Sequence, residues 1–291
     1  MKHRLGGGAL VIMVLLSAFD AAGRPKGHLL IIGGGKRGAA IMEKFVELAG
    51  GDRAKVVVFA MASSYAHEVG PEQAEELRRL GCGEVSALNI DRRQADTDSV
   101  LALLQGVTGV FFSGGDQSRL TAVLQGTKVE ARLHELYAGG AVLGGTSAGA
   151  AVMSAVMITG EERRPVADST FNQIEADNIV TARGFGFLKT AIVDQHFVRR
   201  RRHNRLISLV LEQPQLAGLG IDEGTAIWVK PDQTFEVIGD HCVIVYDASK
   251  ARLQHDRANH GLRASGVQMH VLRHGAQYDL KAKKVLHLMP R

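Results

Sequence analysis

One serine lies in a glycine-rich turn whose composition is typical of a catalytic nucleophile. Ser147 stands at the centre of the segment 144–150, Gly-Gly-Thr-Ser-Ala-Gly-Ala, between the apolar run 141–143 and the small-residue run 150–155. A strand, a tight Gly-x-Ser-x-Gly turn and a helix form a nucleophile elbow, which lifts the serine hydroxyl above a sheet. The sequence therefore predicts that Ser147 is a nucleophile. The alternative is a glycine-rich connection that contains an incidental serine.

A serine hydroxyl needs a neighbouring base, and this base needs a group that orients it. The apolar run 191–193 leads into polar residues that include His196, and the run 219–221 ends at Asp222 and Glu223. Polar side chains at strand ends suit a site at the carboxyl edge of a parallel sheet. We expect His196 to be the base and either Glu223 or Asp222 to orient it. Each residue alone could instead be structural, the histidine in a core and the acids in a turn.

The segment 109–117 is a further strand-like run that ends in a loop with two glycines. Glycines allow the backbone to approach a ligand closely. We expect the backbone N–H groups of Gly115 and Ala148 to form an oxyanion hole, and Gln117 to contact the substrate. Asp116 could also cap a helix that begins near Gln117, and the two interpretations are compatible.

Five arginines follow the proposed base within the segment 199–205. The planar guanidinium fork binds carboxylates with two hydrogen bonds, so the segment suits a substrate that carries carboxylates. A solvated charged helix or a nucleic-acid-binding patch is the alternative.

The order Ser, His, acid along the chain differs from the orders in α/β-hydrolases, chymotrypsin and subtilisin. Three motifs instead resemble those of the cyanophycinases: 144–150, 220–226, and 194–197 together with Arg200, Arg202, Arg205 and Leu206. These enzymes are serine exopeptidases related to peptidase E, an aspartyl dipeptidase, and their fold is similar to that of class I glutamine amidotransferases. The resemblance covers roughly residues 27–250.

The resemblance implies roles for the candidate residues. Ser147 would attack and form an acyl-enzyme, His196 would be the base and Glu223 the acid, with Asp222 as a neighbour only. The substrate would be cyanophycin, a polyaspartate with arginine on each side chain, and the products β-aspartyl-arginine dipeptides. The implied substrate-binding residues are Gln117, Asp194, Gln195, Arg200, Arg202 and Arg205. The resemblance also implies a homodimer. We expect no cofactor and no nucleic-acid partner.

Two alternative functions remain open at this point. One is an aspartyl dipeptidase of the peptidase E type, which would act on short aspartyl-arginine peptides or similar substrates. The other is a non-catalytic protein that binds anions or nucleic acid through the arginines. An amidotransferase would need a cysteine at position 147, where the chain has serine.

A second glycine motif, Gly-Gly-Gly-Lys-Arg-Gly at 33–38, follows the strand-like run 29–32. It fits the dinucleotide-binding pattern G-x-G-x-x-G. A dinucleotide site also needs an acid at the end of the next strand, and the run 56–63 has none there. We therefore expect this turn to form a wall of the active site.

The elements that must position these residues follow from the apolar pattern of the 291-residue chain. Strand-like runs alternate with amphipathic helical runs such as 71–80 and 128–137, which predicts a mostly parallel sheet with helices on both faces. After about residue 227 the runs become short, and they predict a C-terminal antiparallel extension. The segment 250–266 fits no pattern. The fold class is therefore α/β.

The N-terminal segment is typical of a secretory signal peptide. Three basic residues precede the mostly apolar run 5–19, and small residues follow at 21–23. We expect a signal peptide at 1–23, then a single peptidase domain at 24–291, with 250–291 peripheral. The apolar run is too short to predict a membrane anchor. A secreted or periplasmic bacterial protein is expected.

The two cysteines, Cys82 and Cys242, could pair in an oxidising compartment, although the sequence gives no geometry for a disulfide. The histidines of the C-terminal region lack the spacing of zinc ligands. We therefore expect no metal.

Overall fold

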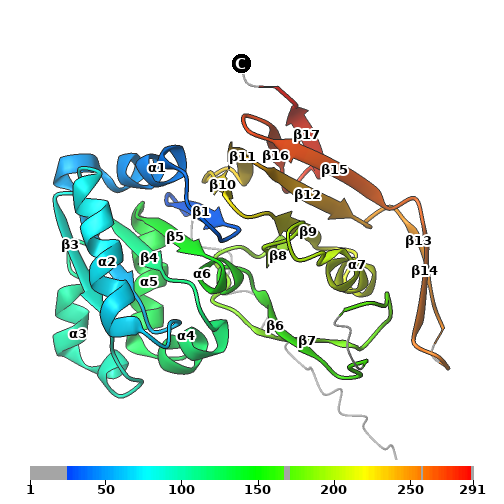
Figure 1. The fold of residues 1–291 in the computed structure, drawn as a ribbon, viewed down its shortest axis with the longest axis horizontal. Helices are drawn as coiled ribbons and strands as arrows, with labels where there is room; N and C mark the ends of the chain where they lie inside the picture. The colour runs from blue at the N-terminus through cyan, green and yellow to red at the C-terminus, as the bar shows by residue number, and fades with distance from the viewer. Residues whose placement is uncertain (1–24, 167–170, 257, 290–291) are drawn as a thin grey trace, which may run out of the picture.

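The computed structural model describes residues 25–166, 171–256 and 258–289, which form two large sheets and a separate two-stranded hairpin (Figure 1). The first sheet has nine strands in the order β17-β16-β11-β10-β1-β5-β4-β2-β3. Its strands are β1 (His28–Ile32), β2 (Lys55–Phe59), β3 (Glu84–Leu88), β4 (Gly109–Phe112), β5 (Val142–Thr146), β10 (Thr225–Val229), β11 (Thr234–Gly239), β16 (Gln277–Asp279) and β17 (Lys284–His287). The strands from β1 to β3 in this order are parallel, and β10, β11, β16 and β17 extend them antiparallel.

The inner parallel strands β1, β2, β4 and β5 are almost entirely buried because helices cover both faces of the sheet. Along β1, Leu29 packs into the core on one face and Leu30 into the core on the other. Helices α1 (Ala39–Ala49) and α2 (Ala66–Arg79) cover the second face. The first face is covered by α3 (Asp98–Leu103), α4 (Gln117–Leu124), α5 (Lys128–Gly139) and α6 (Ala148–Ala151). Short 3-10 helices occur at Gly51–Arg53 and Gln94–Asp96.

The second sheet has six strands in the order β15-β12-β9-β8-β6-β7. These are β6 (Val156–Glu162), β7 (Ile179–Arg183), β8 (Ala191–Gln195), β9 (Ala217–Ile221), β12 (Cys242–Asp247) and β15 (Gln268–Arg273). Helix α7 (His203–Glu212) packs Leu206 and Leu209 on one face of this sheet. Val193 and Leu219 on the other face belong to the core shared with the first sheet. The two sheets therefore enclose one common core.

The segment 250–266 is a β-hairpin of β13 (Arg252–Asp256) and β14 (Gly261–Ser265). It projects beyond α7 at the edge of the molecule (Figure 1). Its strand residues are mostly exposed, so they lack the alternation of buried and exposed positions that predicts a strand.

The structure confirms the predicted fold class: a mostly parallel sheet flanked by helices, with antiparallel C-terminal strands. It also divides the parallel strands between two sheets, since β8 and β9 belong to the second. The proposed signal peptide at 1–23 lies outside the described residues. In the part of the chain that the structure describes, no helix is long and apolar enough to span a membrane.

Candidate active site

Ser147 occupies a strained turn between β5 and α6. Its φ of 54° and ψ of −109° lie in a region that costs a non-glycine residue about 1–3 kcal/mol. The turn is held by hydrogen bonds from the Ser147 N–H to the carbonyl of Ile32 (3.0 Å) and from the N–H of Ala151 to the carbonyl of Ser147 (3.0 Å). Such a turn presents the side chain at the carboxyl end of the parallel strands, as a nucleophile elbow does.

The two glycines that flank Ser147 allow the close packing of this turn. A Cβ on Gly145 would lie 2.3 Å from the carbonyl oxygen of Gly149. A Cβ on Gly149 would lie 2.2 Å from the carbonyl oxygen of Phe112 in β4. Both distances are far below van der Waals contact, so any larger residue would displace the helix from the sheet.

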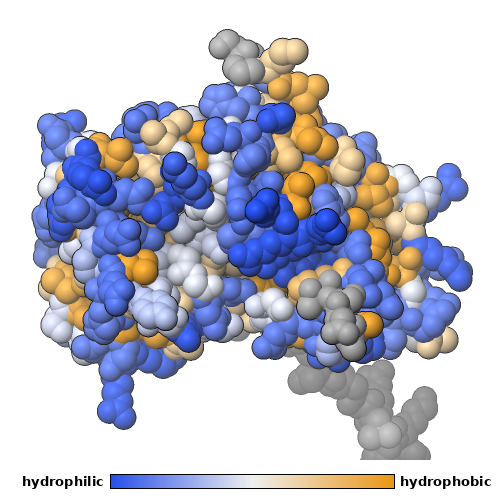
Figure 2. Space-filling view, viewed as in Figure 1, coloured by the Kyte–Doolittle hydropathy of each residue, from blue (hydrophilic) through white to orange (hydrophobic). Residues whose placement is uncertain are grey.

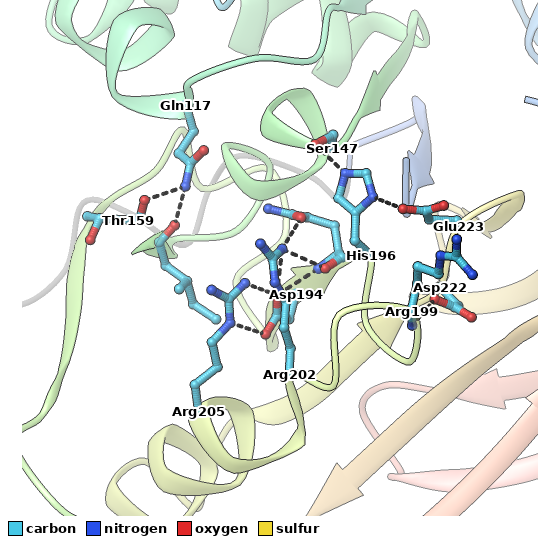
Figure 3. A network of polar contacts seen from close by, with 12 residues as sticks. Gln117, Ser147, Thr159, Asp194, His196, Arg199, Arg202, Arg205, Asp222 and Glu223 are labelled. Carbon is cyan, nitrogen blue, oxygen red and sulfur yellow. Dashed lines mark hydrogen bonds and ion pairs between the residues drawn. The ribbon is translucent and has the colours of Figure 1, made fainter. Parts of the chain in front are cut away.

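The hydroxyl of Ser147 contacts His196, and His196 contacts Glu223 (Figure 3). The distance from Ser147 Oγ to His196 Nε2 is 2.8 Å, and from His196 Nδ1 to Glu223 Oε1 it is 2.6 Å. His196 follows β8, and Glu223 lies in the β9–β10 connection that joins the two sheets. The three predicted residues therefore converge from different strand ends.

The hydrogen bonds assign the proton of the imidazole. The pKa of Glu223 is lowered, chiefly by its hydrogen bond to His196, so its carboxylate is ionised and can only accept. His196 Nδ1–H must then donate to Glu223, which leaves Nε2 free to accept the Ser147 hydroxyl proton. Burial lowers the pKa of His196, and this effect outweighs the opposite effect of the hydrogen bond with Glu223. His196 is therefore a neutral base at neutral pH.

The glycine turn after β1 packs directly against this pair. A Cβ on Gly34, whose φ is 98°, would lie 2.3 Å from His196 Cε1. The Gly34 carbonyl accepts the N–H of Gly224 (2.9 Å), and the Gly33 carbonyl accepts the N–H of His196 (2.7 Å). The turn of the motif at 33–38 thus forms a wall of the site, as expected, and the absence of a side chain at Gly34 gives space to the imidazole.

The loop after β4 lies beside the serine. A Cβ on Gly114 would be 3.5 Å from Ser147 Cβ, and the next residue, Gly115, has a φ of 139°. In the described part of the chain, the N–H groups of Gly115 and Ala148 donate to no protein acceptor. Both remain available as donors to an oxyanion. Asp116 caps α4 by accepting the N–H of Ser118 (2.8 Å), as the helix-cap interpretation predicted.

The side-chain amide nitrogen of Gln117 is hydrogen-bonded within the protein. Its Nε2 donates to the carbonyls of Ile158 (2.8 Å) and Thr159 (2.7 Å) in β6, and its side chain is buried. Figure 3 shows it on the far side of the network from Glu223. The amide nitrogen therefore ties α4 to the second sheet, which leaves only the amide oxygen for a substrate.

Asp194 and Arg205 form a buried ion pair instead of presenting their charges to a ligand. Arg205 Nε donates to Asp194 Oδ2 (2.7 Å), and Nη2 donates to Oδ1. Both residues are only 1% exposed, and the Arg205 guanidinium stacks on the ring of Phe171 at 4.7 Å. The expectation that they contact substrate directly does not fit this burial, although Arg205 Nη1 has no hydrogen-bond partner among the described residues.

The remaining arginines differ in their surroundings. Arg202 is half-buried, and it donates to the backbone and side-chain oxygens of Gln195. Burial and the neighbouring Arg205 lower the pKa of Arg202 to about 10, so it stays charged at neutral pH. Arg200 is exposed and near enough to His196 to disfavour its protonation. Arg199 and Arg201 are also exposed, as expected for solvated residues.

Most of this arginine segment does not form the charged helix of the alternative interpretation. Residues 197–202 form turns, with Arg201 at a φ of 54°, and α7 begins only at His203. Figure 2 shows strongly hydrophilic side chains gathered where β8 and α7 lie in Figure 1. The connection between these two elements carries the exposed Arg199, Arg200 and Arg201.

Comparisons with known proteins agree with this site. Residues 29–237 match the model of peptidase family S51. A cyanophycinase of Synechococcus elongatus is 36% identical over 271 residues, which cover 90% of this chain and 82% of the relative. A cyanophycinase of Trichormus variabilis is 34% identical and covers 91% of this chain and 90% of the relative. The chain belongs to peptidase family S51.

The S51 peptidase also shares its fold with a solved structure. The crystal structure of a peptidase from an acI-B1 actinobacterium matches 88% of this chain and 98% of its own length, with a TM-score of 0.63 and 23% identity. The sequence-based prediction of a cyanophycinase-related serine peptidase is therefore confirmed at the level of the family.

The structure describes both cysteines of this S51 peptidase. Cys82 and Cys242 are both free thiols in the structure. Among the described residues, no group of three or more His, Cys, Asp or Glu side chains could hold a metal ion.

We predict that the Asp194–Arg205 pair stabilises the fold. Asp194→Asn keeps the shape but leaves the Arg205 cation buried without a counter-charge, so unfolding should become easier by about 3–5 kcal/mol. Urea denaturation measures this loss. Asp98→Asn is the matched control, because Asp98 pairs with Lys128 on the exposed surface (2.9 Å) and should leave the midpoint unchanged. Unchanged stability of Asp194→Asn, with weaker substrate binding, would restore the direct substrate role.

Proposed function

We propose that this S51 peptidase hydrolyses cyanophycin to β-aspartyl-arginine dipeptides, with Ser147, His196 and Glu223 as its catalytic residues. The contact from Ser147 Oγ to His196 Nε2 carries the proposal, because it couples a hydroxyl to a neutral base. The cyanophycinases that are 34–36% identical over nine-tenths of this chain supply the substrate class.

The contacts support a stepwise mechanism. Ser147 Oγ attacks the scissile carbonyl while its proton moves to His196 Nε2, and Glu223 stabilises the imidazolium that forms. The N–H groups of Gly115 and Ala148 donate to the oxyanion. His196 then protonates the leaving amine, which leaves an acyl group on Ser147. Water, activated by the same imidazole, hydrolyses this ester and frees the serine.

The substrate presents carboxylates and guanidinium groups to the site. Arg200 and Arg202 lie close enough to the imidazole to lower its pKa, so we propose that they bind the α-carboxylates. The side-chain oxygens of Gln195 and Gln117 are the candidate acceptors for an arginine side chain of the substrate. The buried ion pair of Arg205 and Asp194 positions Arg202, because Asp194 also lies 3.8 Å from the Arg202 guanidinium.

The direct test incubates the protein with insoluble cyanophycin and identifies the soluble products by mass. The proposal expects β-aspartyl-arginine dipeptides as the main product. Hydrolysis of short aspartyl peptides without attack on the polymer would favour a dipeptidase of the peptidase E type. Inactivity on both substrate classes would refute the proposal.

We predict that lysine cannot replace Arg202. It keeps the charge but loses the planar pair of donors, and hydrogen bonds to charged groups contribute about 1.5–3 kcal/mol. Arg202→Lys should therefore lower kcat/KM on cyanophycin roughly ten- to a hundredfold. Arg201→Lys is the matched control, because Arg201 is exposed and should tolerate the change. Equal tolerance at both positions would remove Arg202 from the substrate site.

The pH dependence follows from the direction of the shift in the His196 pKa. Burial holds this pKa below the ordinary 6.5, and the reaction needs the neutral imidazole. The acid limb of kcat/KM should therefore lie below pH 6.5, with activity rising as the pH increases through the limb. In Glu223→Gln the limb should move further toward acid, since the negative charge of Glu223, which raises the pKa of His196, is lost. A limb above pH 6.5 would contradict this account.

We further propose that the protein is exported through the segment 1–23. Its basic start, apolar run and small residues support this location. Expression of the full gene in a bacterial host, followed by N-terminal sequencing of the exported protein, tests it. A start near Arg24 agrees with the proposal, whereas cytoplasmic protein that begins at Met1 contradicts it.

A further inference from the structure

His196 depends on a backbone conformation that its surroundings must maintain. Its φ of 49° lies in the left-handed region, which a non-glycine residue adopts only where neighbouring structure holds it. Arg201, five residues later, also has a positive φ of 54°. The turn between β8 and α7 therefore contains two unfavourable residues, and one of them is the proposed base.

Hydrogen bonds inside the turn explain only part of its conformation. The N–H of Arg200 donates to the His196 carbonyl (2.9 Å), and the N–H of Arg202 donates to the Phe197 carbonyl (3.0 Å). The N–H of Arg199 has a different partner. It donates to the side chain of Asp222, with 2.9 Å between Arg199 N and Asp222 Oδ1.

Asp222 is well placed to act as a fixed anchor. It is 8% exposed, and its own N–H donates to the Cys242 carbonyl of β12 (3.1 Å). Its carbonyl oxygen packs so closely on the glycine turn that a Cβ on Gly33 would lie 2.1 Å away. Its backbone therefore packs on the glycine turn that borders His196, and its side chain binds the turn that follows His196.

The two adjacent acids contact different parts of the base. Glu223 binds the imidazole ring, whereas Asp222 binds the backbone three residues beyond His196 (Figure 3). We propose that Asp222 is a positioning residue, which fixes the turn so that His196 Nε2 stays within reach of Ser147. This inference rests on the proposed catalytic role of His196.

The contact specifies the chemistry that position 222 requires. A backbone N–H needs an acceptor oxygen of the right length, and the side-chain oxygen of asparagine is such an acceptor. The positioning role therefore needs no negative charge. A residue that acted on the imidazole or on a substrate cation through its charge would not tolerate asparagine.

The test compares Asp222→Ala, Asp222→Asn and the parent in kcat and KM on cyanophycin. Because a misplacement of about 1 Å can cost on the order of a hundredfold in rate, Asp222→Ala should lose roughly ten- to a hundredfold in kcat with KM nearly unchanged. Asp222→Asn should recover most of this loss. Asp232→Ala is the matched control, because exposed Asp232 also accepts a backbone N–H, that of Thr234 (2.9 Å), outside the site.

A second measurement does not depend on the substrate. The proton that His196 Nδ1 shares with Glu223 should give a downfield NMR resonance, assigned by its absence in His196→Gln. It should persist in Asp222→Asn and broaden or vanish in folded Asp222→Ala. If the parent fails to hydrolyse cyanophycin, the proposed function is wrong, while this resonance still tests the anchor. An unchanged resonance or kcat in Asp222→Ala, or asparagine as damaging as alanine, would overturn the inference.

Discussion

Ser147→Ala should abolish hydrolysis while leaving the fold intact. The hydroxyl is the proposed attacking group, and loss of a triad nucleophile costs on the order of 10⁴- to 10⁶-fold in kcat. Alanine also fits the turn, since it keeps the Cβ of Ser147 and lacks only the hydroxyl. Hydrolysis of cyanophycin by the variant and the parent at equal concentration measures the effect, and circular dichroism checks the fold.

Ser154→Ala is the matched control for this substitution. Ser154 is buried just after the same short helix, and its hydroxyl donates to the carbonyls of Ala151 (3.2 Å) and Val156 (2.8 Å). Its loss should leave kcat nearly unchanged. Activity of Ser147→Ala within tenfold of the parent would refute the role of Ser147 as nucleophile.

His196 should act as one unit with Ser147, and this is the second large effect that we expect. His196→Ala alone should cost on the order of 10⁴- to 10⁶-fold in kcat, because the hydroxyl then has no base. Adding Ser147→Ala to it should cost little more, since effects within one catalytic unit are not additive. Kinetics of the two single variants and the double variant complete the cycle. Losses that multiply would mean that the two residues act independently.

The same logic separates the two acids. Glu223→Gln should lose on the order of 10³- to 10⁴-fold in kcat, since an amide can no longer hold the imidazole in its tautomer as an ionised carboxylate does. Asp222→Asn should lose far less. The reverse order would mean that Asp222 orients the base, against the 2.6 Å contact between His196 and Glu223.

The nucleophile elbow could be predicted from sequence because its determinants are local. Gly145 and Gly149 must be small for steric reasons that act within a few residues of Ser147. The helices at 71–80 and 128–137 were also predicted by local periodicity, and the structure places α2 at Ala66–Arg79 and α5 at Lys128–Gly139. The small helix after Ser147 is shorter than the run 150–155 suggests and ends at Ala151.

The division into two sheets could not be predicted from the same patterns. Strand β8 is as apolar as a strand of the first sheet, because the shared core covers one of its faces and α7 the other. An apolar run indicates that a strand is buried on both faces, but it does not indicate which other strands this strand pairs with. The hairpin at 250–266 could not be predicted because its strands have few buried positions and therefore no apolar pattern.

Which arginines are buried and which are exposed also depended on tertiary contacts. Arg205 lies beside Leu206 and Leu209 on the face of α7 that packs on the sheet, which is a sign of burial that the sequence does contain. Asp194 is an acid in the fully buried strand β8 and therefore required a cation. The spacing between them, and the stacking of Arg205 on Phe171, could be seen only in the structure. The close packing of Gly34 against the imidazole could likewise be seen only in the structure.

Covalent labelling tests the central claim most directly. The protein is treated with a small serine-directed acylating reagent, digested, and its peptides are identified by mass while activity on cyanophycin is followed. We predict one label, on the peptide that contains Ser147, formed in step with the loss of activity and much more slowly in His196→Ala. Full inactivation with Ser147 unlabelled, or with the label on another residue, would contradict the account.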